Sequence, residues 1–297
     1  PPIMAEFPDV VLVNERRQGL AYARNAGVCA STGDIIVMTD DDVIAPPGWL
    51  TQLVEPFADP NVMIVTGNVL PIELETNAQK LFEAYGGLSR GFDPKDVDGE
   101  WFESFRLQAV PTWTLGATAN AAFRADIFWH PQIGLMDEAL GPGMPSGVGE
   151  DTYLFYKVLK VGYKLIYQPG AFVLHKHRQT LDSLRNQLFN YSKGHVAYHL
   201  TTFLRDGDWR ALIHIGLRLP SWHFFRLLRW GIGQRDYPLR LILTELWGNV
   251  LGPWTLWQSR RRVAREGRSQ QYVPPISRPQ ESAAGEIIGG ERNALAN

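Results

Sequence analysis

Apolar runs alternate with stretches of helical periodicity through the first 70 residues. Val and Ile are frequent in the runs at 9–13, 34–40 and 61–70, which therefore predict buried strands. The stretches 19–31 and 46–59 between them repeat apolar residues at helical spacing. The order strand, helix, strand, helix, strand is typical of a parallel sheet with crossover helices. We therefore expect an α/β fold with a mostly parallel sheet flanked by helices.

The next hundred residues continue this pattern less regularly. Helices are expected at 77–92 and 150–162, and a loop at 93–101. Small and apolar residues at 113–129 indicate the wall of a pocket. The run 163–177 predicts two strands around a Pro-Gly turn.

Composition divides the chain into three parts. Residues 1–178 hold the strand and helix pattern and are expected to form the α/β domain. Residues 179–267 are expected to be an amphipathic helical region, because apolar, aromatic and Arg residues interleave there at helical spacing. Residues 268–297 have little apolar content and predict a disordered tail.

The helical region has two possible surroundings. Trp and Arg interleaved on amphipathic stretches are typical of helices that lie in a membrane interface. The alternative is a helical subdomain whose aromatic side chains fill its own core. Arg240 and Glu245 interrupt the last apolar stretch, so it does not predict a membrane span, which needs about 20 nearly uncharged residues.

Charge is distributed unevenly along the 297 residues, although the net charge is only −2. Residues 205–268 contain 12 Arg, no Lys and 5 acidic residues, a local balance of +7 that leaves −9 for the remainder. This division suggests an acidic catalytic part and a basic part that faces something anionic. The single cysteine, Cys29, cannot build a disulfide framework, which fits a reducing compartment.

Three carboxylates stand in a row after an apolar run, in the sequence Thr39-Asp40-Asp41-Asp42-Val43. Like charges this close repel unless a cation neutralises them. In an extended chain Asp40 and Asp42 point to the same side and Asp41 points away. Two carboxylates on one side can hold Mg²⁺ or Mn²⁺, which prefer oxygen ligands. The alternative is a solvated turn, although the end of a parallel strand is where open α/β sheets bind ligands.

Two further segments carry candidate chemistry. Glu150 and Asp151 open a predicted helix behind a Gly-rich loop, where a carboxylate could accept the proton of a substrate hydroxyl. Capping of the helix by Glu150 is the simpler alternative. His175 and His177 share one face of a strand, and near an aspartate cluster one imidazole could complete a Mn²⁺ shell. A purely structural role is the alternative for this pair.

Together these segments resemble the family 2 glycosyltransferases of the GT-A fold, a Rossmann-like α/β architecture. The resemblance covers residues 15–177. It rests on the Ala-Arg-Asn sequence at 23–25, the aspartate row, the stretch GATANAAFRADIF at 116–128 and the run GVGEDTYLFYKVLKVG at 147–162. These elements follow one another in the order and spacing of the family, which is more specific than any one motif.

The resemblance also implies roles for single residues. Asp42 would bind the divalent metal, Mn²⁺ or Mg²⁺, and Asp40 would serve the metal and the ribose or sugar side of the donor. Asp151 would be the catalytic base. A strand histidine would be a further metal ligand, and we favour His175 over His177. The donor and acceptor pocket would also involve Arg24, Asn25, Asp41, Gly116, Ala117 and Asn120.

The chemistry implied by the resemblance is inverting sugar transfer. The donor would be a nucleotide-diphospho-sugar, whose diphosphate the metal neutralises as it leaves. The acceptor would be a hydroxyl of a glycan or of a lipid-linked precursor in polysaccharide biosynthesis. The enzyme would be cytoplasmic and peripheral on the cytoplasmic face of the membrane, bound through its basic, Trp-rich region.

Two departures from the family pattern affect these expectations. The strand, helix and aspartate motif that open such domains and hold the nucleotide do not precede Pro1, so we expect an N-terminally truncated domain that binds its donor weakly. The QxxRW motif of processive synthases is missing, because the Arg-Trp pair at 229–230 lacks the required Gln. This absence predicts the addition of one or a few sugars.

Three other functions are weaker interpretations. A non-catalytic, membrane-associated scaffold could keep the fold, but the aspartates that such a protein could lose are all present. A phosphotransfer or nucleotidyl-transfer enzyme could use the same metal site, yet the sequence has no GxxxxGK[ST] phosphate loop. Nucleic-acid binding is disfavoured, because the aromatic residues of the basic region lie in apolar helical stretches.

Overall fold

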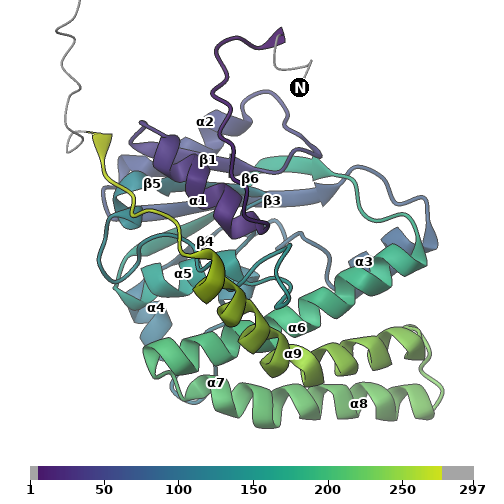
Figure 1. The fold of residues 1–297 in the computed structure, drawn as a ribbon. Coiled ribbons are helices and arrows are strands. Elements are labelled where there is room, and N and C mark those ends of the chain that lie inside the picture. The colour runs from purple at the N-terminus through teal and green to yellow at the C-terminus, as the bar shows by residue number, and fades with distance from the viewer. Residues whose placement is uncertain (1–5, 276–297) are drawn as a thin grey trace, which may run out of the picture.

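The computed structural model describes residues 6–275, which form an α/β layer packed against a group of long helices (Figure 1). Strands of one mixed sheet follow the order β1-β5-β3-β6-β2, with β4 paired to β6. Their bounds are Ile35–Thr39 (β1), Val43–Ile44 (β2), Val62–Pro71 (β3), Lys95–Val97 (β4), Asn120–Arg124 (β5) and Lys164–His175 (β6). The expected α/β fold with flanking helices and a helical C-terminal region is confirmed.

Strand direction differs from the expected mostly parallel sheet. Among the described strands, only β3 and β6 pair in parallel. β5 inserts between β1 and β3 and runs antiparallel to both, so the two strands joined by the predicted crossover helix are not neighbours. The sheet is therefore mixed, because a strand from much later in the sequence takes the place beside β1.

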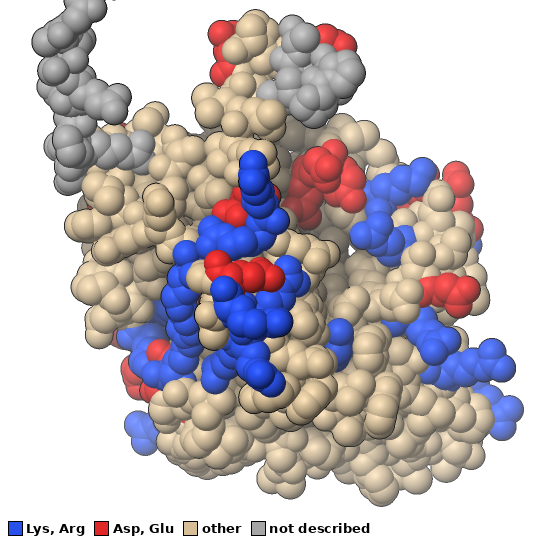
Figure 2. Space-filling view, in the orientation of Figure 1, with Lys and Arg blue, Asp and Glu red and all other residues tan. Residues whose placement is uncertain are grey.

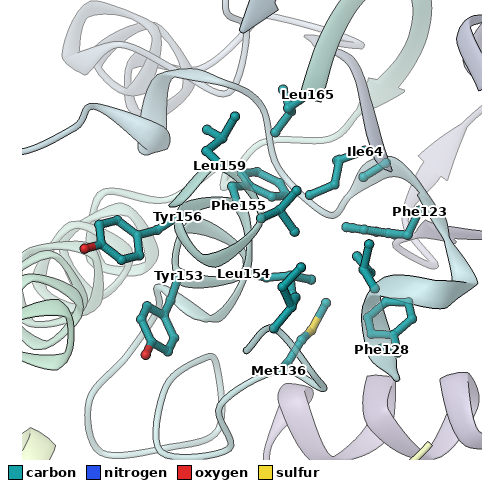
Figure 3. Close-up of a cluster of buried hydrophobic side chains, with 14 of the residues drawn as sticks. Ile64, Phe123, Phe128, Met136, Tyr153, Leu154, Phe155, Tyr156, Leu159 and Leu165 are labelled. Atoms are coloured by element: carbon teal, nitrogen blue, oxygen red, sulfur yellow. The ribbon is translucent and has the colours of Figure 1, made fainter. Parts of the chain in front are cut away.

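Helices of the α/β domain are α1 (Leu20–Ala30), α2 (Trp49–Val54, continued by a 3₁₀ turn at Glu55–Ala58), α3 (Asn77–Tyr85), α4 (Gly99–Ser104) and α5 (Glu150–Lys160). Figure 3 shows α5 packed against side chains of the sheet. The fully buried members of this cluster include Leu154, Phe155, Leu159, Ile64, Phe123 and Leu165. Burying one such side chain contributes about 1.5–3 kcal/mol, so this packing anchors α5 and with it the helix's first turn.

The helical region contains α6 (Leu181–Asp206), α7 (Arg210–Ile213), a π-helical turn (His214–Arg218), α8 (Leu219–Gly231) and α9 (Leu239–Glu266). α6 and α9 approach closely where Gly248 and Gly252 of α9 face α6. A Cβ at Gly252 would lie only 2.6 Å from the Val196 Cβ. None of the helices in residues 6–275 combines the length and apolar character that a membrane crossing requires.

Three local expectations are wrong. Residues 9–13 are not a strand: Val11 is 79 % exposed, and no described strand pairs with this segment. An apolar run forms a strand only when a neighbouring strand is present to pair with it. The composition of the run does not reveal whether such a neighbour exists. The run 163–177 holds one strand, β6, in which an irregularity rather than a turn absorbs the Pro-Gly pair. Residues 93–101 contain β4 and the start of α4 instead of a loop.

The segment after α9 returns to the α/β domain. Ser269 donates its backbone N–H to Glu138 Oε1 at 2.8 Å. Tyr272 is 1 % exposed, and its ring meets Phe128 edge-on with 6.2 Å between centroids. The described part of the expected disordered tail is therefore packed on the domain, while residues 276–297 lie outside the described residues.

We expect Gly252→Ala to lower the free energy of unfolding by about 1–3 kcal/mol, because the added methyl group would overlap Val196 and push α6 and α9 apart. Gly231→Ala, at the end of α8, is the matched control, since a Cβ there meets no atom within 4 Å. Urea unfolding followed by circular dichroism compares the two variants with the wild type. Equal stabilities of the two variants would contradict the close packing.

Candidate active site

A large open cleft runs from the end of β1 to the helical region. Its lining comes from the aspartate row after β1, the loop at 116–119, the first turn of α5 and residues of α6, α8 and α9. Figure 2 shows acidic side chains gathered beside a hollow on one face of the molecule. The predicted site residues that line the cleft are Arg24, Asp40, Asp41, Asp42, Gly116, Ala117, Asp151 and His175.

Asp40, Asp42 and His175 form a candidate metal site. One potential ligand atom of each lies within 4.8 Å of the others. The sheet register explains this proximity: Val43 of β2 pairs with His175 of β6, so the residue before β2 lies beside the end of β6. His175 Nε2 is 3.4 Å from Asp42 Oδ1. Two carboxylates and an imidazole fit Mn²⁺, and the carboxylates also fit Mg²⁺.

His177 contacts a different carboxylate. Its Nε2 lies 2.7 Å from Glu83 Oε1 on α3, and its ring meets Phe82 edge-on with 4.8 Å between centroids. Its Nδ1 is 3.4 Å from Nδ1 of His175, whose other nitrogen is directed to Asp42. Burial lowers the pKa of His175, which favours the neutral imidazole that binds metals. The geometry therefore favours His175 as the ligand, with His177 behind it.

Arg24 connects the metal site to the first turn of α5. Its guanidinium donates to Asp40 Oδ1 at 2.9 Å and to Glu150 Oε1 at 3.0 Å. Burial, together with the charge of Asp151, raises the pKa of Glu150 to about 7, and Arg24 opposes this rise. The other oxygen of Glu150 accepts the N–H of Gly149. Glu150 is therefore held by Arg24 and by the loop that precedes α5.

Asp151 lines the cleft at the same turn. Its Oδ1 accepts the N–H of Thr152 at 2.7 Å, and its Oδ2 accepts the N–H of Thr118 at 3.3 Å. Thr118 follows Gly116, whose φ of +123° and close contact with Thr66 leave no space for a side chain. A carboxylate has about four lone-pair sites, so these bonds leave Asp151 able to accept a proton.

Two predicted pocket residues have structural contacts instead. Asn25 is fully buried, donates to the carbonyl of Met136 and accepts its N–H. Asn120 is fully buried and donates to the carbonyls of Asn68 and Ala171, where β3 and β6 lose their regular register. Neither lines the cleft, so both predictions are corrected. Buried backbone groups need hydrogen-bond partners. The sequence does not reveal whether an Asn side chain bonds to such backbone groups or to a ligand.

Three residues of the site escape prediction from the sequence. Thr118 holds the carboxylate of the candidate base, Glu83 holds His177, and Arg90 lines the cleft. Thr118 lies in the stretch that predicts a pocket wall, so a signal for it exists. Glu83 and Arg90 carry no such signal, because charged residues are common on exposed helices and loops.

The N-terminal part of the chain matches a known family. Residues 4–130 match the sequence model described as Glycosyl transferase family 2. The match to the family contains the aspartate row and Arg24, and it ends before α5 and β6.

Curated proteins that resemble this chain are named as glycosyltransferases. The pre-mycofactocin glycosyltransferase of Mycobacterium tuberculosis is 28% identical over 171 residues, which cover 58% of this chain and 33% of that protein. The glucosyl-dolichyl phosphate glucuronosyltransferase of Haloferax volcanii is 29% identical over 179 residues, which cover 58% of this chain and 52% of that protein. The chain thus spans a third to a half of the length of these relatives.

Solved glycosyltransferase structures show a limited likeness to the chain. Glucosyl-3-phosphoglycerate synthase from Mycobacterium tuberculosis, in complex with Mn²⁺ and UDP-glucose, is 18% identical with a TM-score of 0.37, covering 66% of this chain and 56% of its own. GalNAc-T7 with UDP, GalNAc and Mn²⁺ is 16% identical with a TM-score of 0.39, covering 66% of this chain and 41% of its own. The likeness to the family therefore rests on the sequence match of residues 4–130.

We expect Asp42→Ala to weaken Mn²⁺ binding by about 100-fold, because it removes one carboxylate of the three-residue cluster. Isothermal titration calorimetry measures the affinity. Asp41→Ala is the matched control: it removes a carboxylate from the same row but from outside the cluster, and should keep the wild-type affinity. An unchanged affinity in Asp42→Ala would place the ion elsewhere.

Glu150 makes stability depend on pH. Its pKa is raised from 4.5 to about 7, so between these values the folded chain retains a proton that the unfolded chain has lost. Stability must then fall as the pH rises through this window. We expect Glu150→Gln to reduce this fall, measured by urea unfolding at about pH 5 and about pH 8. The exposed Glu103→Gln serves as control; if Glu150→Gln behaves like it, Glu150 does not titrate in this range.

Proposed function

We propose that this chain carries the catalytic core of a metal-dependent, inverting glycosyltransferase. It moves a sugar from a nucleotide-diphospho-sugar to a hydroxyl of a glycan or of a lipid-linked acceptor. The observation that carries the proposal is one cleft lined by both the Asp40, Asp42 and His175 cluster and Asp151. The match of residues 4–130 to the family model and the glycosyltransferase names of the relatives support the same reaction class.

Donor binding is assigned to the end of β1 and its neighbours. Asp40, Asp42 and His175 would hold Mn²⁺ or Mg²⁺, which supplies neutralisation of the charge that develops on the leaving diphosphate. Arg24 orients Asp40 through its 2.9 Å hydrogen bond. Asp41 lines the cleft beside this cluster, and we assign it to the ribose or sugar of the donor.

Proton transfer is assigned to Asp151. The backbone N–H groups of Thr118 and Thr152 orient its carboxylate, which accepts the proton of the acceptor hydroxyl as that oxygen attacks the anomeric carbon. Attack opposite the leaving diphosphate inverts the configuration at this carbon. The neighbouring Glu150 is buried and paired with Arg24, so it is unsuited to form a covalent sugar intermediate, which supports a single displacement.

The helical region supports a membrane-bound acceptor. Large apolar side chains are more than 40 % exposed along α8, at the residue after it and along α9: Phe224, Phe225, Leu228, Ile232, Trp247, Val250, Trp254 and Trp257. The four on α9 recur three or four residues apart and so share one face. Figure 2 shows few charged side chains over the end of the molecule that α7 and α8 build in Figure 1.

This apolar end is continuous with the cleft, because Trp222 of α8 and Asn249 of α9 line it. Arg261 lies 4.8 Å above the ring of Trp257, and such neighbouring Arg and Trp residues suit an anionic interface. We therefore propose peripheral attachment to the cytoplasmic face of a membrane, where a lipid-linked precursor of a polysaccharide would reach Asp151 from the bilayer side.

Sugar transfer by the chain is tested with Mn²⁺, a panel of nucleotide-diphospho-sugars and either polyprenyl phosphate or glycan acceptors, with products identified by mass spectrometry. We expect Asp151→Asn to reduce transfer by about 10²–10⁴-fold and to leave donor affinity unchanged, because it removes only the base. Asp126→Asn, on an exposed turn of the same domain, should keep full activity. Wild-type turnover by Asp151→Asn would assign the base to another group.

Membrane attachment is tested by sedimentation with vesicles that contain phosphatidylglycerol. The rings of Trp254 and Trp257 stack with 4.5 Å between centroids, and we expect their joint replacement by Ser to weaken binding at least about tenfold through lost apolar burial. Trp129→Ser is the control, since Trp129 is 45 % exposed on the α/β domain. Equal vesicle binding by all three proteins would contradict the proposed interface.

A further inference from the structure

Three histidines gather in the helical region, and the proposed reaction uses none of them. His195 and His199 lie four residues apart on α6 and therefore project from one face of that helix. His214 opens the π-helical turn between α7 and α8. One ring nitrogen of each lies within 4.8 Å of the others. Single π-helical turns occur frequently at functional sites, which makes this placement of His214 notable.

The three rings are enclosed on one side and open on another. Trp113 contacts all of them, with 5.1 to 5.4 Å between ring centroids. His195 Nε2 lies 2.8 Å from His214 Nε2, and the ring centroids are 4.2 to 4.9 Å apart. His195 and His214 also line the cleft that holds Asp151. A small ligand in the cleft can therefore reach the cluster.

His199 provides a second, independent observation that points to a ligand site. It is 1 % exposed, and its Nε2 has no hydrogen-bond partner among the described residues. An unsatisfied buried polar group costs about 1–3 kcal/mol, so a partner for this nitrogen would stabilise the fold. Burial lowers the pKa of all three imidazoles, which favours their neutral, metal-binding form.

We propose that His195, His199 and His214 bind one divalent transition-metal ion, with Zn²⁺ the best match. Neutral imidazole suits Zn²⁺, and three protein ligands with one open position are typical of zinc sites that bind water or substrate. The cluster contains no carboxylate, which distinguishes it from the Asp40, Asp42 and His175 site and disfavours Mg²⁺.

Binding one ion requires an adjustment of the rings, because ligand nitrogens up to 4.8 Å apart must meet at a common distance. Zn–N distances of about 2.0–2.1 Å place tetrahedral ligand nitrogens about 3.3 Å apart. The 2.8 Å contact between His195 and His214 must then widen by about half an ångström. An open fourth position would be reached from the cleft, because His195 and His214 line it.

The experiment uses the complete chain carrying Asp42→Ala, which removes the separate Mn²⁺ site, and Zn²⁺ or Co²⁺ as the probe. We expect one Zn²⁺ per chain after dialysis, measured by inductively coupled plasma mass spectrometry. Co²⁺ should give the intense visible absorption of a tetrahedral site. His199→Gln and His214→Gln, on different helical segments, should each lose the ion. His130→Gln, whose ring contacts Tyr163 outside the cleft, should retain it.

Each outcome bears on the proposal. Failure of the parent chain to bind Zn²⁺, or retention of the ion by both His199→Gln and His214→Gln, overturns it. Circular dichroism establishes that the variants are folded. If neither variant folds, the Co²⁺ spectrum of the parent decides: tetrahedral bands support the site, and weak octahedral bands overturn it. Sugar transfer is not part of the readout, so this result is independent of the proposed reaction.

Discussion

The geometry of the cleft depends on one guanidinium group that bonds two carboxylates. Arg24 lies on α1, while Asp40 follows β1 and Glu150 begins α5, 16 and 126 residues away in the sequence. Without Arg24, the buried Glu150 would lack a countercharge beside Asp151, and a buried unpaired charge is strongly destabilising. The same group therefore holds the metal-binding end of the sheet at a set position relative to the candidate base.

The sequence predicts an element correctly where the apolar residues of its pattern are also the residues that the core buries. β1, β3 and α5 are predictable, because each has a continuous or periodic set of apolar residues that the core takes up. The aspartate row is likewise recognisable, because it follows the apolar run of β1 directly in the sequence. The run at 9–13 has the same apolar composition but stays exposed, which shows that pairing rather than composition makes a strand.

Contacts between distant segments are what the sequence does not reveal. The insertion of β5 between β1 and β3, and the burial of Asn25 and Asn120 against backbone groups, depend on elements far apart in the chain. The choice of His175 over His177 follows from the β2 and β6 register, not from their spacing. In the helical region the sequence shows the helical periodicity. It does not show that Gly248 and Gly252 of α9 lie against α6.

The return of the chain after α9 limits how the protein can be divided. The carbonyl of Gly267 accepts hydrogen bonds from Arg17 and from the Tyr22 hydroxyl. Further along the same segment, the ring of Tyr272 packs edge-on against the ring of Phe128. A fragment that ends near residue 178 would lack the segment from Gly267 to Tyr272. The side of Phe128 that Tyr272 covers would then be exposed to water. The change of composition near residue 178 marks a change of surface chemistry, whereas contacts with the α/β domain continue beyond α9 to Tyr272.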